Sequence, residues 1–321
     1  MRSRLAAIVA ALALLCACHN SGRKRIAVVP KANSHAFWVS VHAGAAAAGH
    51  QFDVDVLWNG PALETDYDRQ MQIVDSMLAQ HPDGLAVAAA ERHALNRSLE
   101  RAATLGIPVT VFDSAVDSTQ YMTFVATDNY KAGQMSAREL ARLVGGRGPV
   151  AMLMNAPGSA STVDRERGFE DVLRADFPDI QIVARQFSMS DRAKGRAAAE
   201  NILTAHPDLA GIFASSELSS AGASLALKSR SLAGKVRLVA FDATDDLLAD
   251  LKAGAIDALV VQDPFQMGFQ AVKTLVDKLR GGAPPKQIDL PARVIHKTDL
   301  DLPEVHQLLY PDLKKYVGGA S

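Results

Sequence analysis

The amino-acid sequence predicts an α/β protein built from two similar lobes, each a doubly wound parallel β-sheet with helices on both faces. Three observations support this fold class. Short apolar runs alternate with amphipathic stretches along most of the chain, which is typical of strands that alternate with helices. Aromatic residues make up only 6% of the 321 residues while aliphatic residues dominate, as in strands buried on both faces. The second half of the chain also repeats motifs of the first half.

The expected strands and helices follow one another in two series. In the first series, the apolar runs predict strands at 26–29, 54–57, 84–87 and 109–112, and the segments between them predict helices at about 39–49, 66–80 and 93–105. The second series predicts strands at 150–153, 180–183, 211–213 and 238–241. Because a strand–helix–strand connection is right-handed and joins parallel strands, each series predicts one parallel sheet.

The internal repeat places matching carboxylates in the two series. A His-Pro-Asp triplet precedes a strand that leads to Glu91 in the first series and to Glu217 in the second. Further on, Asp113 and Asp242 each follow a Phe that ends the next strand. Ligands of open α/β sheets bind beyond the carboxyl ends of the strands, so facing lobes would direct both aspartates into one cleft, where they can accept hydrogen bonds from ligand hydroxyls. The alternative is that each aspartate only caps the next turn or helix.

The first eighteen residues differ in character from the rest. Two arginines within residues 1–4 precede an apolar run over 5–15 that is too short to span a bilayer, and Leu15-Cys16-Ala17-Cys18 follows. This predicts an export signal over 1–18 and a polar tether over 19–24. The motif resembles the lipobox of bacterial lipoproteins, which implies that Cys18 is acylated and anchors the chain at the extracytoplasmic face of a membrane. An ordinary signal peptide that is cut nearby is the alternative.

Charge and motifs limit the partners and cofactors. With 34 basic and 35 acidic residues and a formal charge of −1, the chain gives no reason to expect nucleic acid as a partner. Phosphate-loop, dinucleotide-binding and metal-ligand spacings are not found, and both cysteines fall within the export signal. We therefore expect no cofactor, no metal site and no disulfide.

Six pieces of the chain resemble, in order, the periplasmic sugar-binding proteins of the ribose-binding type: 26–31 with 37–45, 126–129, 161–169, 191–195, 239–242 and 262–264. The resemblance covers about 25–295 and implies the type I periplasmic binding protein fold, in which the chain crosses three times between the lobes. It implies an N-terminal lobe of 25–127 plus 263–290 and a C-terminal lobe of 128–262 plus 291–298. The remaining tail, 299–321, carries leucines at helical spacing and is expected to pack on a lobe.

The resemblance also implies ligand contacts by motif position. Two aromatic side chains would stack on the sugar, and four polar ones would bind its hydroxyls: Phe37 and Trp38, and Asp113, Arg165, Asp242 and Gln262. The chemistry fits a sugar, because an aromatic face packs on C–H groups while carboxylates and guanidinium groups bind pairs of hydroxyls.

The chain departs from the ribose-binding pattern at several cleft positions. The family has a small hydroxyl residue, Asn, Arg, Phe and Asn at positions that are here Lys31, His35, Ser114, Ser190 and Ser216. Ribose is therefore not the expected ligand, and Lys31, His35 and Ser216 join the predicted ligand-binding residues. The positive charge of Lys31 and His35 could suit a sugar with a carboxylate or phosphate. Alternatively, Lys31 pairs with Asp113 or Glu91 and His35 is a solvated loop residue.

The sequence thus favours a monomeric, exported lipoprotein that delivers a sugar or sugar derivative to the permease of an ABC importer. One alternative is a sensor that presents its ligand-bound state to a receptor or sensor kinase. Another is a carbohydrate-active enzyme that uses Asp113 or Asp242, although the sequence offers no paired nucleophile and base.

Overall fold

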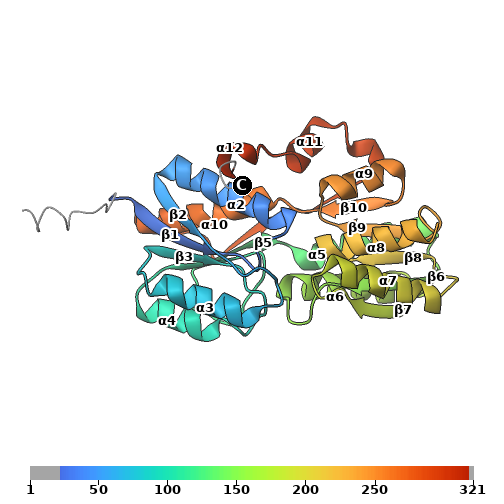
Figure 1. Ribbon diagram of the computed structural model, residues 1–321, viewed down its shortest axis with the longest axis horizontal. Coiled ribbons are helices and arrows are strands. Elements are labelled where there is room, and N and C mark those ends of the chain that lie inside the picture. Colours follow the sequence, from blue (N-terminus) through green and yellow to red (C-terminus); the bar gives the residue numbers. More distant parts are fainter. Residues whose placement is uncertain (1–21, 318–321) are drawn as a thin grey trace, which may run out of the picture.

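The computed structural model describes residues 22–317, and within them the chain forms two α/β lobes that lie side by side (Figure 1). Each lobe contains one six-stranded sheet with helices on both faces. The predicted fold class is therefore confirmed. The expected export signal and Cys18 lie outside the described residues.

The first sheet has the strand order β11-β5-β4-β3-β1-β2 and is parallel throughout. Its strands are β1 (Lys24–Val29), β2 (Val54–Trp58), β3 (Gly84–Val87), β4 (Val109–Phe112), β5 (Thr123–Thr127) and β11 (Gln287–Leu290). One apolar cluster fills the space between this sheet and two helices, α2 (Ala36–Phe52) and α10 (Pro264–Leu279). A second cluster covers the other face beneath α3 (Tyr67–Leu78) and α4 (Asn96–Thr104).

The second sheet repeats this plan in the order β12-β10-β9-β8-β6-β7, with β12 antiparallel to β10 and the other strands parallel. Its strands are β6 (Gly148–Met154), β7 (Ile180–Phe187), β8 (Gly211–Ala214), β9 (Arg237–Phe241), β10 (Ala258–Val261) and β12 (Arg293–Ile295). One face packs on α5 (Asn129–Val144) and α6 (Ala160–Asp176). The other packs on α7 (Arg192–Ala205), α8 (Glu217–Ser229) and α9 (Asp245–Ala253).

All eight strands expected from the sequence are present, and the two sheets correspond strand by strand. Some bounds differ. The helix expected at 39–49 runs over Ala36–Phe52, three residues longer at each end, and the one expected at 93–105 begins only at Asn96. The first sheet also contains two short strands, β5 and β11, that were not inferred from apolar runs.

Glycines allow one helix pair in each lobe to approach closely. A Cβ on Gly44 of α2 would overlap the carbonyl oxygen of Phe265 in α10, and a Cβ on Gly133 of α5 would overlap the carbonyl oxygen of Arg165 in α6. Any side chain at these positions would force the helices apart. The packing therefore fixes α2 and α6, which both carry predicted site residues, on their sheets.

The chain crosses three times between the sheets: between β5 and α5, between β10 and α10, and between β11 and β12. This confirms the expected three-crossing hinge. None of the helices within residues 22–317 is both long and apolar enough to span a bilayer.

The C-terminal segment lies across both lobes (Figure 1). After a 3₁₀ turn at Lys297–Asp299, α11 (Pro303–Leu309) inserts Val305 into the core of the second lobe. The next helix, α12 (Lys314–Val317), lies against α2 of the first lobe, and the Tyr316 ring is 5.9 Å from that of Phe265. We expected the tail to pack on a lobe; it contacts the two lobes at once.

Candidate functional site

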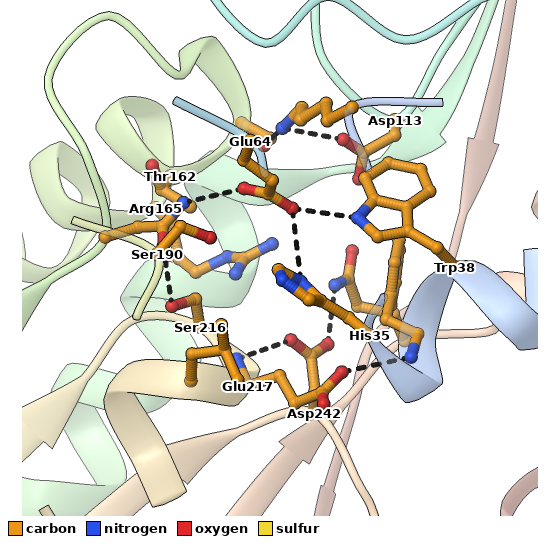
Figure 2. Close-up of a pocket in the computed structure, with 16 residues that line it drawn as sticks. His35, Trp38, Glu64, Asp113, Thr162, Arg165, Ser190, Ser216, Glu217 and Asp242 are labelled. Atoms are coloured by element: carbon orange, nitrogen blue, oxygen red, sulfur yellow. Dashed lines mark hydrogen bonds and ion pairs between the residues drawn. The ribbon is translucent and has the colours of Figure 1, made fainter. Parts of the chain in front are cut away.

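A cavity lies between the lobes, at the carboxyl ends of the strands. All nine residues predicted to bind ligand line it: Lys31, His35, Phe37, Trp38, Asp113, Arg165, Ser216, Asp242 and Gln262. Seven others complete the wall: Glu64, Asn155, Ser161, Thr162, Ser190, Glu217 and Leu218. Figure 2 shows that the labelled side chains converge from both lobes.

The matched aspartates share an uncommon backbone geometry. Asp113 follows β4 with φ of 59°, and Asp242 follows β9 with φ of 68°, both in the left-handed region that aspartate tolerates better than most residues. Each donates its backbone N–H over 2.9 Å to a carbonyl of the neighbouring strand, Val125 or Val260. The turn after each strand directs the carboxylate into the cleft, as the repeat predicted, and neither side chain caps a helix of its own.

Lys31 makes a buried ion pair with the first aspartate. Its Nζ lies 2.8 Å from Oδ2 of Asp113, and the two side chains are 3% and 5% exposed. Nζ also donates to the hydroxyls of Ser161 (3.0 Å) and Ser159 (3.3 Å) from the second lobe. The two hydroxyls take two of the three ammonium donors, and the charge of Lys31 lies against Oδ2 of Asp113, which has no hydrogen-bond partner within residues 22–317. Lys31 was expected either to contact a ligand or to pair with Asp113 or Glu91, and the structure shows the pair with Asp113.

Glu64 connects the first-lobe wall to the second lobe. Its Oε1 accepts from Nε1 of Trp38 at 2.8 Å and lies 3.6 Å from Nδ1 of His35, while Oε2 accepts from Nδ2 of Asn155 at 3.2 Å (Figure 2). Burial alone would raise the pKa of Glu64, but Lys31, His35 and these two hydrogen bonds outweigh it and lower the pKa. His35 is 8% exposed, so the alternative that it is a solvated loop residue is wrong.

Arg165 is held rigidly in the second lobe. Its guanidinium lies 3.5 Å from the centroid of the Phe241 ring, and its Nη2 and Nε donate to Oδ1 of Asn129 at 2.7 and 3.3 Å. Nη1 donates to the Ser215 carbonyl. A guanidinium has five N–H donors, so two remain for a ligand in a fixed orientation.

The second aspartate has neutral partners instead of a lysine. Oδ1 of Asp242 accepts from Nε2 of Gln262 at 2.7 Å, and Oδ2 accepts from the backbone N–H of Glu217 at 3.0 Å. Burial raises the pKa of Asp242, although the charge of Arg165 opposes this. The amide oxygen of Gln262 is buried and has no hydrogen-bond partner within residues 22–317, so it is available to a ligand donor.

The lobes are in contact around the cavity. Besides Lys31 and Glu64, the backbone N–H of Phe37 donates to Oε2 of Glu217 at 3.0 Å, and the Arg92 N–H donates to the Gly158 carbonyl at 3.1 Å. The structure is therefore a closed form. No group of three or more His, Cys, Asp or Glu side chains in the described part of the chain is arranged to hold a metal ion.

Sequence reasoning missed three charged or amide side chains of the site: Glu64, Asn155 and Glu217. Asn155 directly follows β6, and Glu217 begins α8 shortly after β8. The strand-end rule, applied to every strand rather than to the matched aspartates alone, would have found these two. Glu64 lies in the loop between β2 and α3, and its role depends on the tertiary contact with Trp38.

Comparison with known proteins agrees with this architecture. Residues 26–283 match the model of the periplasmic binding protein domain. The chain is 32% identical over 232 residues to the ribose import binding protein RbsB of Bacillus subtilis, covering 72% of this chain and 74% of that protein.

Solved structures give the same result. A carbohydrate transporter solute-binding protein from Agrobacterium radiobacter in complex with D-arabinose has a TM-score of 0.87 and 30% identity, covering 90% of this chain and 99% of that one. An ABC transporter solute-binding protein from Agrobacterium vitis with bound D-fucose has a TM-score of 0.87 and 33% identity, covering 89% and 100%. Together with the fold, these matches establish that the chain belongs to the periplasmic binding protein family and, within it, to the ribose-binding type.

Proposed function

We propose that the protein is the extracytoplasmic solute-binding component of an ABC importer and encloses one sugar or sugar derivative between its lobes. The observation that carries this proposal is the closed inter-lobe cavity, to which each lobe contributes one strand-end aspartate. The relatives named above import ribose or hold D-arabinose or D-fucose, which supports a sugar as the ligand.

In this proposal the aromatic and polar walls have separate roles. Phe37 stacks on the C–H face of the sugar, while Trp38 is 2% exposed and supports Phe37 edge-on at 4.9 Å. The carboxylates of Asp113 and Asp242 accept hydrogen bonds from ligand hydroxyls, and the guanidinium of Arg165 donates hydrogen bonds to ligand oxygens. The amide oxygen of Gln262 accepts a further hydrogen bond.

The charges of the cavity favour a neutral ligand over an anionic one. Four carboxylates line it (Glu64, Asp113, Glu217 and Asp242), against the cations of Lys31 and Arg165. Lys31 is engaged by Asp113 and His35 faces Glu64, so neither offers a free positive charge to a carboxylate or phosphate. We infer that a sugar acid or sugar phosphate is excluded, which differs from the expectation based on Lys31 and His35 alone.

We further propose the lobe boundaries given by the resemblance, a monomeric state, delivery to a membrane permease, and a lipid anchor at Cys18. The anchor rests on the Leu15–Cys18 motif and the short apolar run before it. A tethered binding protein would stay close to its permease, which raises the effective concentration of the loaded form at the membrane.

A thermal-shift screen tests the ligand class. The panel contains D-ribose, D-arabinose and D-fucose, with D-ribonate and ribose phosphate as charged counterparts. A ligand at about 100 times its Kd stabilises the folded form by about 2.7 kcal/mol, so the melting temperature should rise by several degrees with a neutral sugar only. A shift with the anions but not with the neutral sugars would contradict the neutral class. Chromatography after incubation checks for product, which would indicate a carbohydrate-active enzyme.

A further inference from the structure

The helix that carries the aromatic wall lacks an N-terminal cap from its own lobe. Helix α2 begins at Ala36, its N-cap residue His35 makes no side-chain capping hydrogen bond, and its first turn contains no acidic residue. The first N–H groups of a helix have no partner within the helix and need an acceptor. Here the acceptor comes from the opposite lobe, because the Phe37 N–H donates to Oε2 of Glu217 at 3.0 Å (Figure 2).

Glu217 is placed for this contact by its own lobe. It is the first residue of α8, and its backbone N–H donates to Oδ2 of Asp242 at 3.0 Å, so its carboxylate lies at the N-terminal turns of both α8 and α2. A carboxylate between two helix N-termini is favoured by both helix dipoles. The charged or titratable side chains that share the cavity with it are Lys31, His35, Glu64, Asp113, Arg165 and Asp242.

We propose that Glu217 is a positioning residue for ligand capture: its carboxylate caps α2 of the opposite lobe only when the lobes are closed, and so fixes Phe37 and the Trp38 ring that supports it at the cleft. This inference rests on the proposed function, since it concerns the same cleft. It also assigns a role to one member of the Glu91–Glu217 pair that the internal repeat singled out.

The contact also couples closure to protons. Burial in the closed form raises the pKa of Glu217 to about 7, with the nearby Asp242 as a further cause. In an open cleft the side chain meets water and its pKa returns toward the ordinary value of 4.5. A group whose pKa is higher in the closed form binds a proton on closing, so closure is favoured at low pH and this advantage is lost as the pH rises through 7.

The test measures closure with and without ligand. Small-angle scattering of the ligand-free protein between pH 8 and 5.5 should show the closed-to-open ratio rising at least about tenfold in the parent. Glu217→Gln keeps an acceptor for the Phe37 N–H but cannot ionise, so most of this rise should disappear. Any pH dependence of closure that remains in this variant would come from Asp242, whose pKa burial also raises. Glu217→Ala removes the cap, and at pH 5.5, where the parent side chain is protonated in the closed form, closure should weaken about 2- to 30-fold, with rescue by the Gln variant.

Glu91→Gln and Glu91→Ala are the matched controls, because the Glu91 carboxylate accepts from the His93 N–H of its own lobe at 2.8 Å. Both should keep the parental pH profile. Calorimetric titration with D-arabinose and D-ribose gives the second readout. The Kd should rise wherever closure weakens and should keep its parental value in the Glu91 variants. If neither sugar binds, the sugar proposal fails while scattering still tests the cap. Equal pH profiles for parent and Glu217→Gln, or parental closure in Glu217→Ala at pH 5.5, would overturn the inference.

Discussion

The buried pair of Lys31 and Asp113 makes a quantitative prediction about the first-lobe side of the cleft. Nζ and Oδ2 are 2.8 Å apart, and neither side chain is more than 5% exposed. The lysine also donates to Ser159 and Ser161 of the second lobe, so the burial of the pair depends on closure. Removing one partner should therefore penalise the closed form, while the open form hydrates the remaining charge.

The magnitude follows from two costs in Asp113→Ala. The variant loses the hydrogen bonds that ligand hydroxyls would donate to the Asp113 carboxylate, each worth about 1.5–3 kcal/mol. It also leaves Lys31 uncompensated in the closed form, and breaking a buried ion pair costs about 3–5 kcal/mol. The affinity for a sugar should thus fall by more than about 100-fold. Lys31→Met removes the positive charge of the pair. It should also weaken binding, because Asp113 is then buried without a cation on closure.

A double-mutant cycle separates these costs. Calorimetric titration of the parent, Asp113→Ala, Lys31→Met and the double variant at pH 7 should give a coupling free energy of about 0.5–3 kcal/mol, because the double variant no longer buries an unpaired charge. Melting temperatures without ligand should change much less than affinity. Additive effects, within about 0.5 kcal/mol, would refute the reasoning that the pair acts as a unit in closure.

Three further predictions concern other parts of the chain. Burial raises the pKa of Glu166 to about 7, so its stabilising contribution is present below its ordinary pKa and is lost as the pH rises through 7. Glu166→Gln should therefore melt above the parent at pH 8 but not at pH 5. An equal difference in melting temperature at both pH values would contradict this. Gly133→Ala should lower the melting temperature by several degrees, since its Cβ overlaps the Arg165 carbonyl oxygen and overpacking costs about 1–3 kcal/mol; an unchanged melting temperature would mean that α5 and α6 separate freely. Metabolic labelling with a fatty acid should be lost in Cys18→Ser and kept in Cys16→Ser, and label retained in the former would exclude acylation at Cys18.

The sequence could predict the scaffold because the signals for it are local. Strand cores such as 84–87 and 238–241 are continuous apolar runs, and the structure buries all four residues of each. Asp113 and Asp242 could be placed at one cleft because the rule for strand ends depends only on strand position, and the repeat identified equivalent strands. The family motifs supplied Arg165, which lies inside α6, and Gln262, which follows β10, a strand that the sequence analysis did not include.

The charge balance of the site could not be predicted in the same way. Whether Lys31 meets a ligand or Asp113 depends on atomic distances between two loops, and the same holds for His35 and Glu64. The partner of the Trp38 N–H is a carboxylate 26 residues away, which no periodicity encodes. Pairings of this kind arise from tertiary packing and from the need of buried polar groups for partners.

The internal symmetry of the fold shows where specificity resides. Asp113 and Asp242 follow equivalent strands with nearly the same backbone geometry, so the scaffold itself treats the two sides of the ligand alike. Their partners differ: a lysine neutralises the first, whereas an amide and a backbone N–H hold the second, beside the carboxylate of Glu217. On the second-lobe side the charge of Arg165 acts on Asp242, but burial still raises the pKa of both Asp242 and Glu217. We therefore expect the ligand to direct hydrogen-bond donors to Asp242 and to the amide oxygen of Gln262, which has no partner within residues 22–317, so that this asymmetry between loop residues on a symmetric scaffold orients it.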